Sequence, residues 1–164
     1  MNWITKFIKP KIASLFRKKT ADSKQALWTT CECKNLIYKE DLQKNLNCCP
    51  KCGAHHKLTC TERFKIFFDN EEFDLISTPL PKDDPINFVD KKKYIDRLKS
   101  AREITKQDDA VIISTGMMSK IQVTVGAQDF RFIGGSFGAA SGEAFIHGVQ
   151  HAIDNKNPFI FFSC

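Results

Sequence analysis

Five of the seven cysteines lie within 22 residues, in a polar segment near the start of the chain. Cys49 and Cys52 are separated by two residues and followed by Gly53, as in a zinc knuckle, where two sulfurs flank a tight turn. A positive φ at Gly53 lets amide hydrogens point towards the sulfurs. Cys31 and Cys33 form a second pair with only one residue between them. These residue types and spacings indicate a metal site with thiolate ligands.

Structural zinc is the metal that this pattern favours. A tetrahedral site with four thiolates leaves no open position for substrate, so its role is to hold the chain together. The side chains of Cys31 and Cys33 must lean together to bring their sulfurs about 3.8 Å apart. If this pair cannot supply two ligands, Cys48, His55 and His56 are possible substitutes.

Two other uses of clustered cysteines fit the sequence less well. A disulfide scaffold needs an oxidising compartment, but the number of cysteines is odd and no apolar signal-peptide core is visible. A redox CxxC motif usually begins a helix, whereas Pro50 and Gly53 indicate a turn. Cys60 lies beyond the cluster, and no pattern assigns it a role.

The net charge of +6 lies in the first 21 residues, which contain six basic residues and no acidic one. The rest of the chain is formally neutral, which argues against a basic groove along a nucleic-acid backbone. We expect residues 1–24 to form a basic amphipathic tail that docks on a partner or frays, with a surface helix or leader as alternatives. Since no run of 18 apolar residues is present, we expect no membrane span.

Residues 58–107 have the pattern of helices joined by a connector. Thr59 and Glu62 form a capping-box signature at the start of the first helix. Three aromatic residues at helical spacing follow: Phe64, Phe67 and Phe68. Three prolines then mark a connector: Pro79, Pro81 and Pro85. The apolar face of a second helix comes next, with Tyr94, Leu98 and Ala101. We interpret this segment, 58–107, as a helical connector.

From Asp108 the pattern changes to strands and a longer helix. We expect, in order, a buried strand at 110–114, a turn at 116–118, a half-buried strand at 121–125, a short strand entering a glycine turn at 129–138, a helix at 138–153 and a buried strand at 159–164. A buried strand needs layers on both faces and, if parallel, further crossover units. We therefore expect the chain to be part of a larger α/β domain.

Gly134 and Gly135 are the candidate ligand-binding residues of this second half. The two glycines let the backbone turn sharply, and amides at the start of the helix that follows are free to donate to an anion, although such a turn also serves simply for packing. The spacing is not that of a dinucleotide loop or a P-loop, and no lysine follows it. His147 and His151 are spaced to share a helix face, but no third metal ligand lies near them in the sequence.

Four separated blocks resemble, in order and spacing, the beta subunit family of bacterial acetyl-coenzyme A carboxylase carboxyltransferase. They are residues 27–59, 88–98, 108–116 and 130–145, and the match covers 25–164. The resemblance implies an α/β fold with a four-cysteine zinc ribbon at 25–57 and the first part of a crotonase-like spiral of ββα units at 108–164. It also implies that the zinc ligands are Cys31, Cys33, Cys49 and Cys52, although the family's first pair is CxxC.

The activity implied by this resemblance is transfer of a carboxyl group from carboxybiotin, held on a carrier protein, to acetyl-CoA, which yields malonyl-CoA for fatty acid biosynthesis. The implied partners are a carboxyltransferase alpha subunit in an α2β2 assembly, the biotin carboxyl carrier protein and biotin carboxylase, all cytoplasmic. Backbone amides would stabilise the enolate, so we nominate no catalytic side chain. Gly134 and Gly135 would shape the acyl-CoA side of the pocket.

Members of this family continue past the position of Cys164 into a serine-glycine-glycine turn, so we expect this chain to be incomplete and inactive alone. A nucleic-acid-binding zinc ribbon is the main alternative, because Trp28, Tyr38 and the basic tail could contact bases and phosphates. A redox or metal-handling module is a further alternative, and it would require exposed thiols of low pKa.

Overall fold

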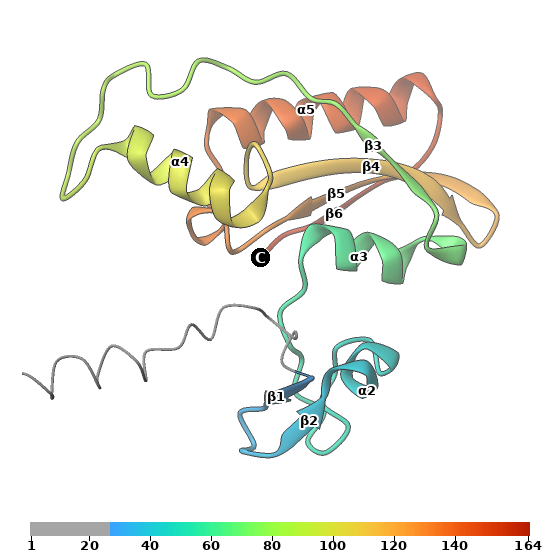
Figure 1. The fold of residues 1–164 in the computed structure, drawn as a ribbon. Coiled ribbons are helices and arrows are strands. Elements are labelled where there is room, and N and C mark those ends of the chain that lie inside the picture. The colour runs from blue at the N-terminus through green and yellow to red at the C-terminus, as the bar shows by residue number, and fades with distance from the viewer. Residues whose placement is uncertain (1–26) are drawn as a thin grey trace, which may run out of the picture. The chain divides into compact units, whose positions relative to one another are not determined.

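The computed structural model describes residues 27–164, which separate into two units at the boundary between His56 and Lys57 (Figure 1). The tail expected at residues 1–24 lies outside the described residues. Each unit has its own cluster of buried side chains. None of the helices in residues 27–164 combines the length and apolar character needed to cross a bilayer.

The first unit is a small antiparallel hairpin followed by one short helix. Strands β1 (Trp28–Thr30) and β2 (Leu36–Tyr38) pair in register, and α2 (Lys39–Lys44) follows directly. Among the described residues 27–56, the buried core contains two large aliphatic side chains, Ile37 and Leu42, which pack against cysteines. So few apolar contacts rarely hold a small fold together without a disulfide or a metal.

The second unit is built on one sheet of four strands in the order β3-β4-β5-β6. The strands are β3 (Phe73–Ile76), β4 (Val111–Met118), β5 (Ile121–Gln128) and β6 (Phe159–Phe162). The pairs β3–β4 and β4–β5 are antiparallel, whereas the pair β5–β6 is parallel. A parallel pair requires a crossover, which here is the helix α5 (Ala139–Asp154).

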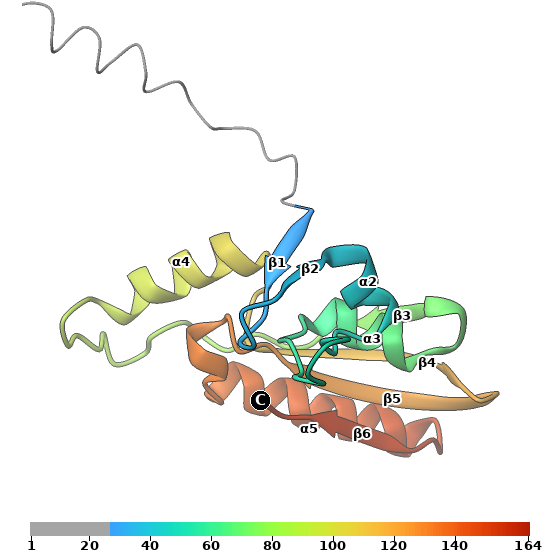
Figure 2. The same cartoon turned by 90° about the horizontal axis from the view of Figure 1, so that it is seen from below.

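Helices α3 (Cys60–Phe67) and α5 cover opposite faces of this sheet, as Figures 1 and 2 show. Alternate residues of β5 divide between the two helices, because successive side chains of a strand point to opposite faces. Val123 and Val125 belong to the core that contains Phe64 and Phe68, next to α3. A third helix, α4 (Tyr94–Thr105), packs through Leu98 against the short 3-10 helix η2 (Ile133–Gly135) and its flanks.

The helices confirm the sequence interpretation closely. Thr59 Oγ1 accepts a hydrogen bond from Glu62 N at 3.1 Å, and Glu62 Oε2 accepts one from Thr59 N at 2.8 Å, so the capping box is complete. The expected face of α4 is the one that packs, since Leu98 and Ala101 are buried. The expected helix at 138–153 is α5, displaced by a single residue.

Four expectations about strands were wrong. The turn expected at 116–118 lies instead at Ser119 and Lys120, because Asp69 accepts hydrogen bonds from both of their amides and β4 continues to Met118. The short strand expected before the glycine turn is absent from the described residues 129–132, which turn rather than extend. Residues 73–76, placed within a helical connector, form β3 because they pair with β4.

The fourth wrong expectation concerns the burial of two strands. Thr124 was expected on an exposed face of β5, but it is fully buried because α5 covers that face. Its hydroxyl is 3.0 Å from His151 Nδ1 and donates to Asn157 Oδ1 at 2.8 Å, which satisfies a polar group that would otherwise be costly to bury. Strand β6 was expected to be buried and is only half-buried, since β5 is its one neighbour among residues 27–164.

We predict that Phe64→Ala destabilises the second unit by about 3–5 kcal/mol, because Phe64 is fully buried and its removal leaves a cavity against β5. Urea unfolding followed by circular dichroism measures the loss. Ile66→Ala, on the same helix but 39% exposed, is the matched control and should cost no more than about 1 kcal/mol. Equal losses would contradict the core assigned here.

Candidate metal centre and ligand-binding turn

Four cysteine sulfurs from two separate turns of the first unit meet at one point. The Sγ atoms of Cys31 and Cys52 are 3.6 Å apart, and those of Cys33 and Cys49 are 3.9 Å apart. All four sulfurs lie within 4.8 Å of one another. Tetrahedral zinc with bonds near 2.3 Å places its sulfurs about 3.8 Å apart, so the cluster has the size of a four-thiolate site.

Two tight turns bring these sulfurs together. After β1 the chain reverses so that Lys34 N donates to Cys31 O at 2.8 Å, and a positive φ of 64° at Lys34 completes the reversal. This turn explains how two cysteines with only one residue between them can both reach the cluster. The second turn is the expected knuckle, in which Gly53 has a φ of 74° and Lys51 N lies 3.4 Å from Cys49 Sγ.

The local hydrogen bonds give the four sulfurs unequal acidity. The side chain of Asn35 donates to Cys33 Sγ at 3.2 Å and lowers the pKa of that thiol to about 6. The amide of Ala54 acts to lower the pKa of Cys52, but the neighbouring sulfurs of Cys49 and Cys33 outweigh it and raise the pKa to about 12. Four close sulfurs therefore resist becoming thiolates together unless a cation compensates their charge.

The possible substitute ligands lie outside this cluster. Cys48 Sγ is 3.2 Å from His55 Nδ1, so these two side chains contact each other. His56 Nε2 is buried without a hydrogen-bond partner among the described residues. Within residues 27–164 the four sulfurs are the one group of at least three His, Cys, Asp or Glu ligand atoms close enough to share an ion. His151 instead contacts Thr124, as described above.

Cys60, to which the sequence assigned no role, is a packing residue. It is 2% exposed and lies at the first position of α3, where its Sγ donates to Ala127 O at 3.3 Å. Burial raises the pKa of this thiol to about 12. Because the thiolate is the reactive form of cysteine, Cys60 is unsuited to act as a nucleophile.

The glycine turn lies where the two parallel strands end. Gly134 and Gly135 form the expected turn, and their φ values are 67° and 71°. Gln128, the last residue of β5, donates through its side-chain amide to Gly135 O and accepts from Cys164 N at 3.3 Å. One side chain thus links the glycine turn to the segment that follows β6. Carboxyl ends of parallel strands are common ligand-binding positions in α/β folds.

The amides available to an anion are those at the start of the helix, as expected, and not those of the glycine turn itself. Gly135 N and Ser136 N donate within the turn, to Phe132 O at 2.9 Å and Ile133 O at 3.3 Å. Helix α5 begins only at Ala139, and its N-cap residue Gly138 supplies no side-chain cap. The free donors are therefore in the first turn of α5, whose amides have no intrahelical acceptor.

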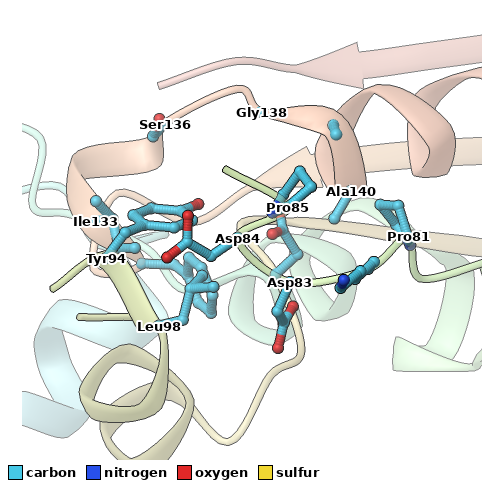
Figure 3. Close-up of a pocket in the computed structure, with 14 residues that line it drawn as sticks. Pro81, Asp83, Asp84, Pro85, Tyr94, Leu98, Ile133, Ser136, Gly138 and Ala140 are labelled. Atoms are coloured by element: carbon cyan, nitrogen blue, oxygen red, sulfur yellow. The ribbon is translucent and has the colours of Figure 1, made fainter. Parts of the chain in front are cut away.

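A cavity of about 150 Å³ lies beside this helix start (Figure 3). Tyr94 and Leu98 of α4, Ile133 of η2 and the connector at 81–85 form much of its wall. Sequence reasoning missed this cavity, because no pattern in the connector indicated that Asp83 would pair with Arg102 of α4.

Three carboxylates line the cavity, and each already accepts a hydrogen bond. Asp83 accepts two from Arg102, at 2.5 and 2.8 Å, which lowers the pKa of Asp83. Asp84 accepts one from Phe88 N at 2.8 Å, and Asp109 accepts one from the buried hydroxyl of Ser141. These bonds fix the connector and the start of α5, so the carboxylates are positioned mainly as structural groups.

We predict that Gly135→Ala destabilises the second unit more than Gly134→Ala does. Both glycines have a left-handed backbone, which costs an alanine about 1–2 kcal/mol. A Cβ at Gly134 would meet nothing within 4 Å, whereas a Cβ at Gly135 would overlap Cys164 Sγ. Thermal and urea unfolding of the two variants compare these costs directly. Equal destabilisation would show that the Cys164 side chain moves aside without a free-energy cost. The left-handed backbone conformation alone would then account for the loss of stability.

Comparison with known proteins extends over both units. Residues 28–52 match the sequence model of the family described as acetyl-CoA carboxylase zinc finger domain. Curated proteins named acetyl-coenzyme A carboxylase carboxyl transferase subunit beta are 42% identical in Pelagibacter ubique, 40% in Jannaschia sp. and 38% in Brucella abortus. The alignments cover 99% of this chain and 54%, 51% and 54% of these relatives.

The chain therefore spans about half the length of the curated relatives that it matches. The matched part includes the cysteine cluster and the glycine turn, which belong to different units. The similarity to acetyl-coenzyme A carboxylase carboxyl transferase beta subunits therefore runs through both units and is not confined to a widespread zinc-binding motif.

Proposed function

We propose that this chain is part of the beta subunit of a carboxyltransferase that carboxylates acetyl-CoA to malonyl-CoA. The observation that carries the proposal is similarity to named beta subunits over 99% of the chain, including the glycine turn. By the same relationship its partners are an alpha subunit in an α2β2 assembly, the biotin carboxyl carrier protein and biotin carboxylase, in the cytoplasm. The β4-β5-α5-β6 order supports a crotonase-like spiral, of which this chain forms the first part.

In this reaction the N–C bond of carboxybiotin breaks, and a C–C bond forms between carbon dioxide and the methyl carbon of acetyl-CoA. The methyl proton passes to the ureido nitrogen of biotin, so the protein need not supply a side-chain base. What it must supply is donors for the thioester oxygen, which becomes negative in the enolate. Each preorganised backbone donor contributes roughly 3 kcal/mol to such a step.

We place the acyl-CoA side of the pocket at the glycine turn and the uncapped start of α5. The turn is held by Gln128 against the end of β6, so its backbone is fixed before substrate arrives. The first amides of α5 are the free donors of this region, and they line the cavity described above. A helix start also carries a partial positive charge, which favours a developing anion.

We also propose that Cys31, Cys33, Cys49 and Cys52 are the four ligands of a structural zinc ion. The distances between their sulfurs match tetrahedral coordination, and a low pKa at Cys33 favours the thiolate form that binds metal. Bound zinc would join the β1–β2 turn to the knuckle around Gly53. It would leave no coordination position for substrate, so its role is separate from carboxyl transfer.

We predict that the purified chain holds about one zinc ion and that chelation unfolds residues 28–56 while residues 108–164 keep their structure. Emission spectrometry measures the metal, and hydrogen exchange measures the two segments separately. Cys31→Ser should release zinc at a chelator concentration that leaves Cys48→Ser loaded, since Cys48 lies outside the four-sulfur cluster. Simultaneous loss of both segments, or equal zinc loss in the two variants, would contradict the ligand assignment.

The proposed activity is tested with a chimera, because the chain covers only about half of its relatives. This chain replaces the corresponding half of the Pelagibacter ubique beta subunit, and the product is assembled with the alpha subunit of that organism. We predict formation of malonyl-CoA from acetyl-CoA and carboxybiotin. The remaining half without this chain is the control. A chimera that assembles but forms no malonyl-CoA would overturn the proposed function.

A further inference from the structure

The β1–β2 hairpin of the first unit presents one face to its cysteines and another to solvent. Trp28 pairs with Tyr38 and Thr30 pairs with Leu36, so these four side chains share one face. Ile37 points to the opposite face, where it is buried against the cysteines. We call the solvent-facing surface of Trp28, Thr30, Leu36 and Tyr38 the outer ribbon face.

The outer ribbon face is apolar, although the solvent side of a hairpin is usually polar. The side chains of Trp28 and Leu36 are 52% and 63% exposed. The ring centroids of Trp28 and Tyr38 are 5.3 Å apart, so the two rings form one aromatic surface. Apolar side chains that gather on an exposed surface mark a place where another segment or molecule binds.

The part of the chain that leads into this face carries apolar side chains of its own. Residues 1–26 lie outside the described residues and end directly before β1. Within them Ile12, Leu15 and Phe16 are spaced by three and four, which is the spacing of side chains that share one side of a helix. The sequence therefore supplies an apolar group that matches the outer ribbon face in character.

Residues 17–26 are long enough to let this group return to the hairpin. They contain no large apolar side chain, so they serve as a polar linker. Ten extended residues span about 33 Å, and a loop of this length closes at a small entropic cost. A short linker also holds its two ends at a high effective concentration, which favours contact within one chain over contact between chains.

The charges beside the outer ribbon face also suit the start of the chain. Glu40 and then Asp41, in the first turn of α2, raise the pKa of Tyr38 through their negative charge. Neither carboxylate forms an ion pair with a described residue. They would attract the first 21 residues, which contain six basic residues and no acidic one, and would repel the phosphates of a nucleic acid.

We propose that residues 12–16 pack on the outer ribbon face of the same chain, with their apolar side chains against Trp28 and Leu36 and the neighbouring basic residues near the first turn of α2. This docking would add apolar contacts to a unit whose described residues form only a small core. The inference goes beyond the proposed function and does not depend on carboxyl transfer.

The test measures how well acrylamide, a neutral quencher, reaches Trp28 in the full chain loaded with zinc. The chain has two tryptophans, so Trp3→Phe leaves Trp28 as the only one that fluoresces. The tail variant adds three changes to this chain: Ile12→Ser, Leu15→Ser and Phe16→Ser. The matched control adds three changes in the polar linker instead: Thr20→Ser, Ser23→Ala and Gln25→Asn.

We expect the tail variant to raise the quenching constant of Trp28 about twofold, because the ring loses its apolar cover, and the control to leave it unchanged. Leu36→Ser should have the same effect as the tail variant, and the two together should add little more, since both remove one contact. Leu36 is exposed, and zinc content with circular dichroism confirms that each variant is folded. Equal quenching in the tail variant and the control would overturn the inference.

The same measurement distinguishes other occupants of the outer ribbon face. Protection of Trp28 that increases with protein concentration would assign the face to the tail of a second copy. Protection that the tail variant retains, or that a single-stranded oligonucleotide must supply, would assign it to another segment or to a nucleic acid. Each of these results would overturn docking within the chain, whereas tail-dependent protection that is independent of concentration supports it.

Discussion

Burial of β5 on both faces is the constraint on which the second unit depends. Val123 and Val125 contact the aromatic core beside α3, while Thr124 and Gly126 face α5 and β6. A Cβ on Gly126 would lie 2.6 Å from the ring of Phe161, so the close approach of β6 requires glycine there. The buried hydroxyl of Thr124 requires partners, which α5 and the start of β6 provide.

This central strand also determines where ligands can bind. Because β6 runs parallel to β5, the chain must cross over through α5, and both strands end on the same side of the sheet. The glycine turn, the Gln128 side chain and the start of α5 therefore gather at one place. Helix α4 lies next to it, since η2 and α4 pack together through Phe132 and Leu98. Packing of the sheet thus positions the proposed acyl side of the substrate pocket.

The first unit reaches its fold by a different physical route. Its described residues, 27–56, bury too few apolar side chains for a conventional core, and four sulfurs occupy their centre instead. Without a cation these sulfurs oppose one another's ionisation, as the opposite pKa changes of Cys33 and Cys52 indicate. With a cation they become the strongest cross-link in the unit. Metal and fold are therefore coupled in this unit, whereas the second unit is stabilised by apolar packing.

The sequence by itself determined features that depend on a few neighbouring residues. These are the capping box at Thr59, the positive φ of Gly53, the position of the glycine turn and the helix α5, because short-range sterics and hydrogen bonds specify them. Only the tertiary structure decided features that depend on distant partners: the pairing of β3 with β4, the burial of Thr124, the meeting of the four cysteine sulfurs, and the pairing of the connector with α4 through Asp83 and Arg102. Such features depend on which distant part of the chain packs against a residue, and the local sequence pattern does not indicate that part.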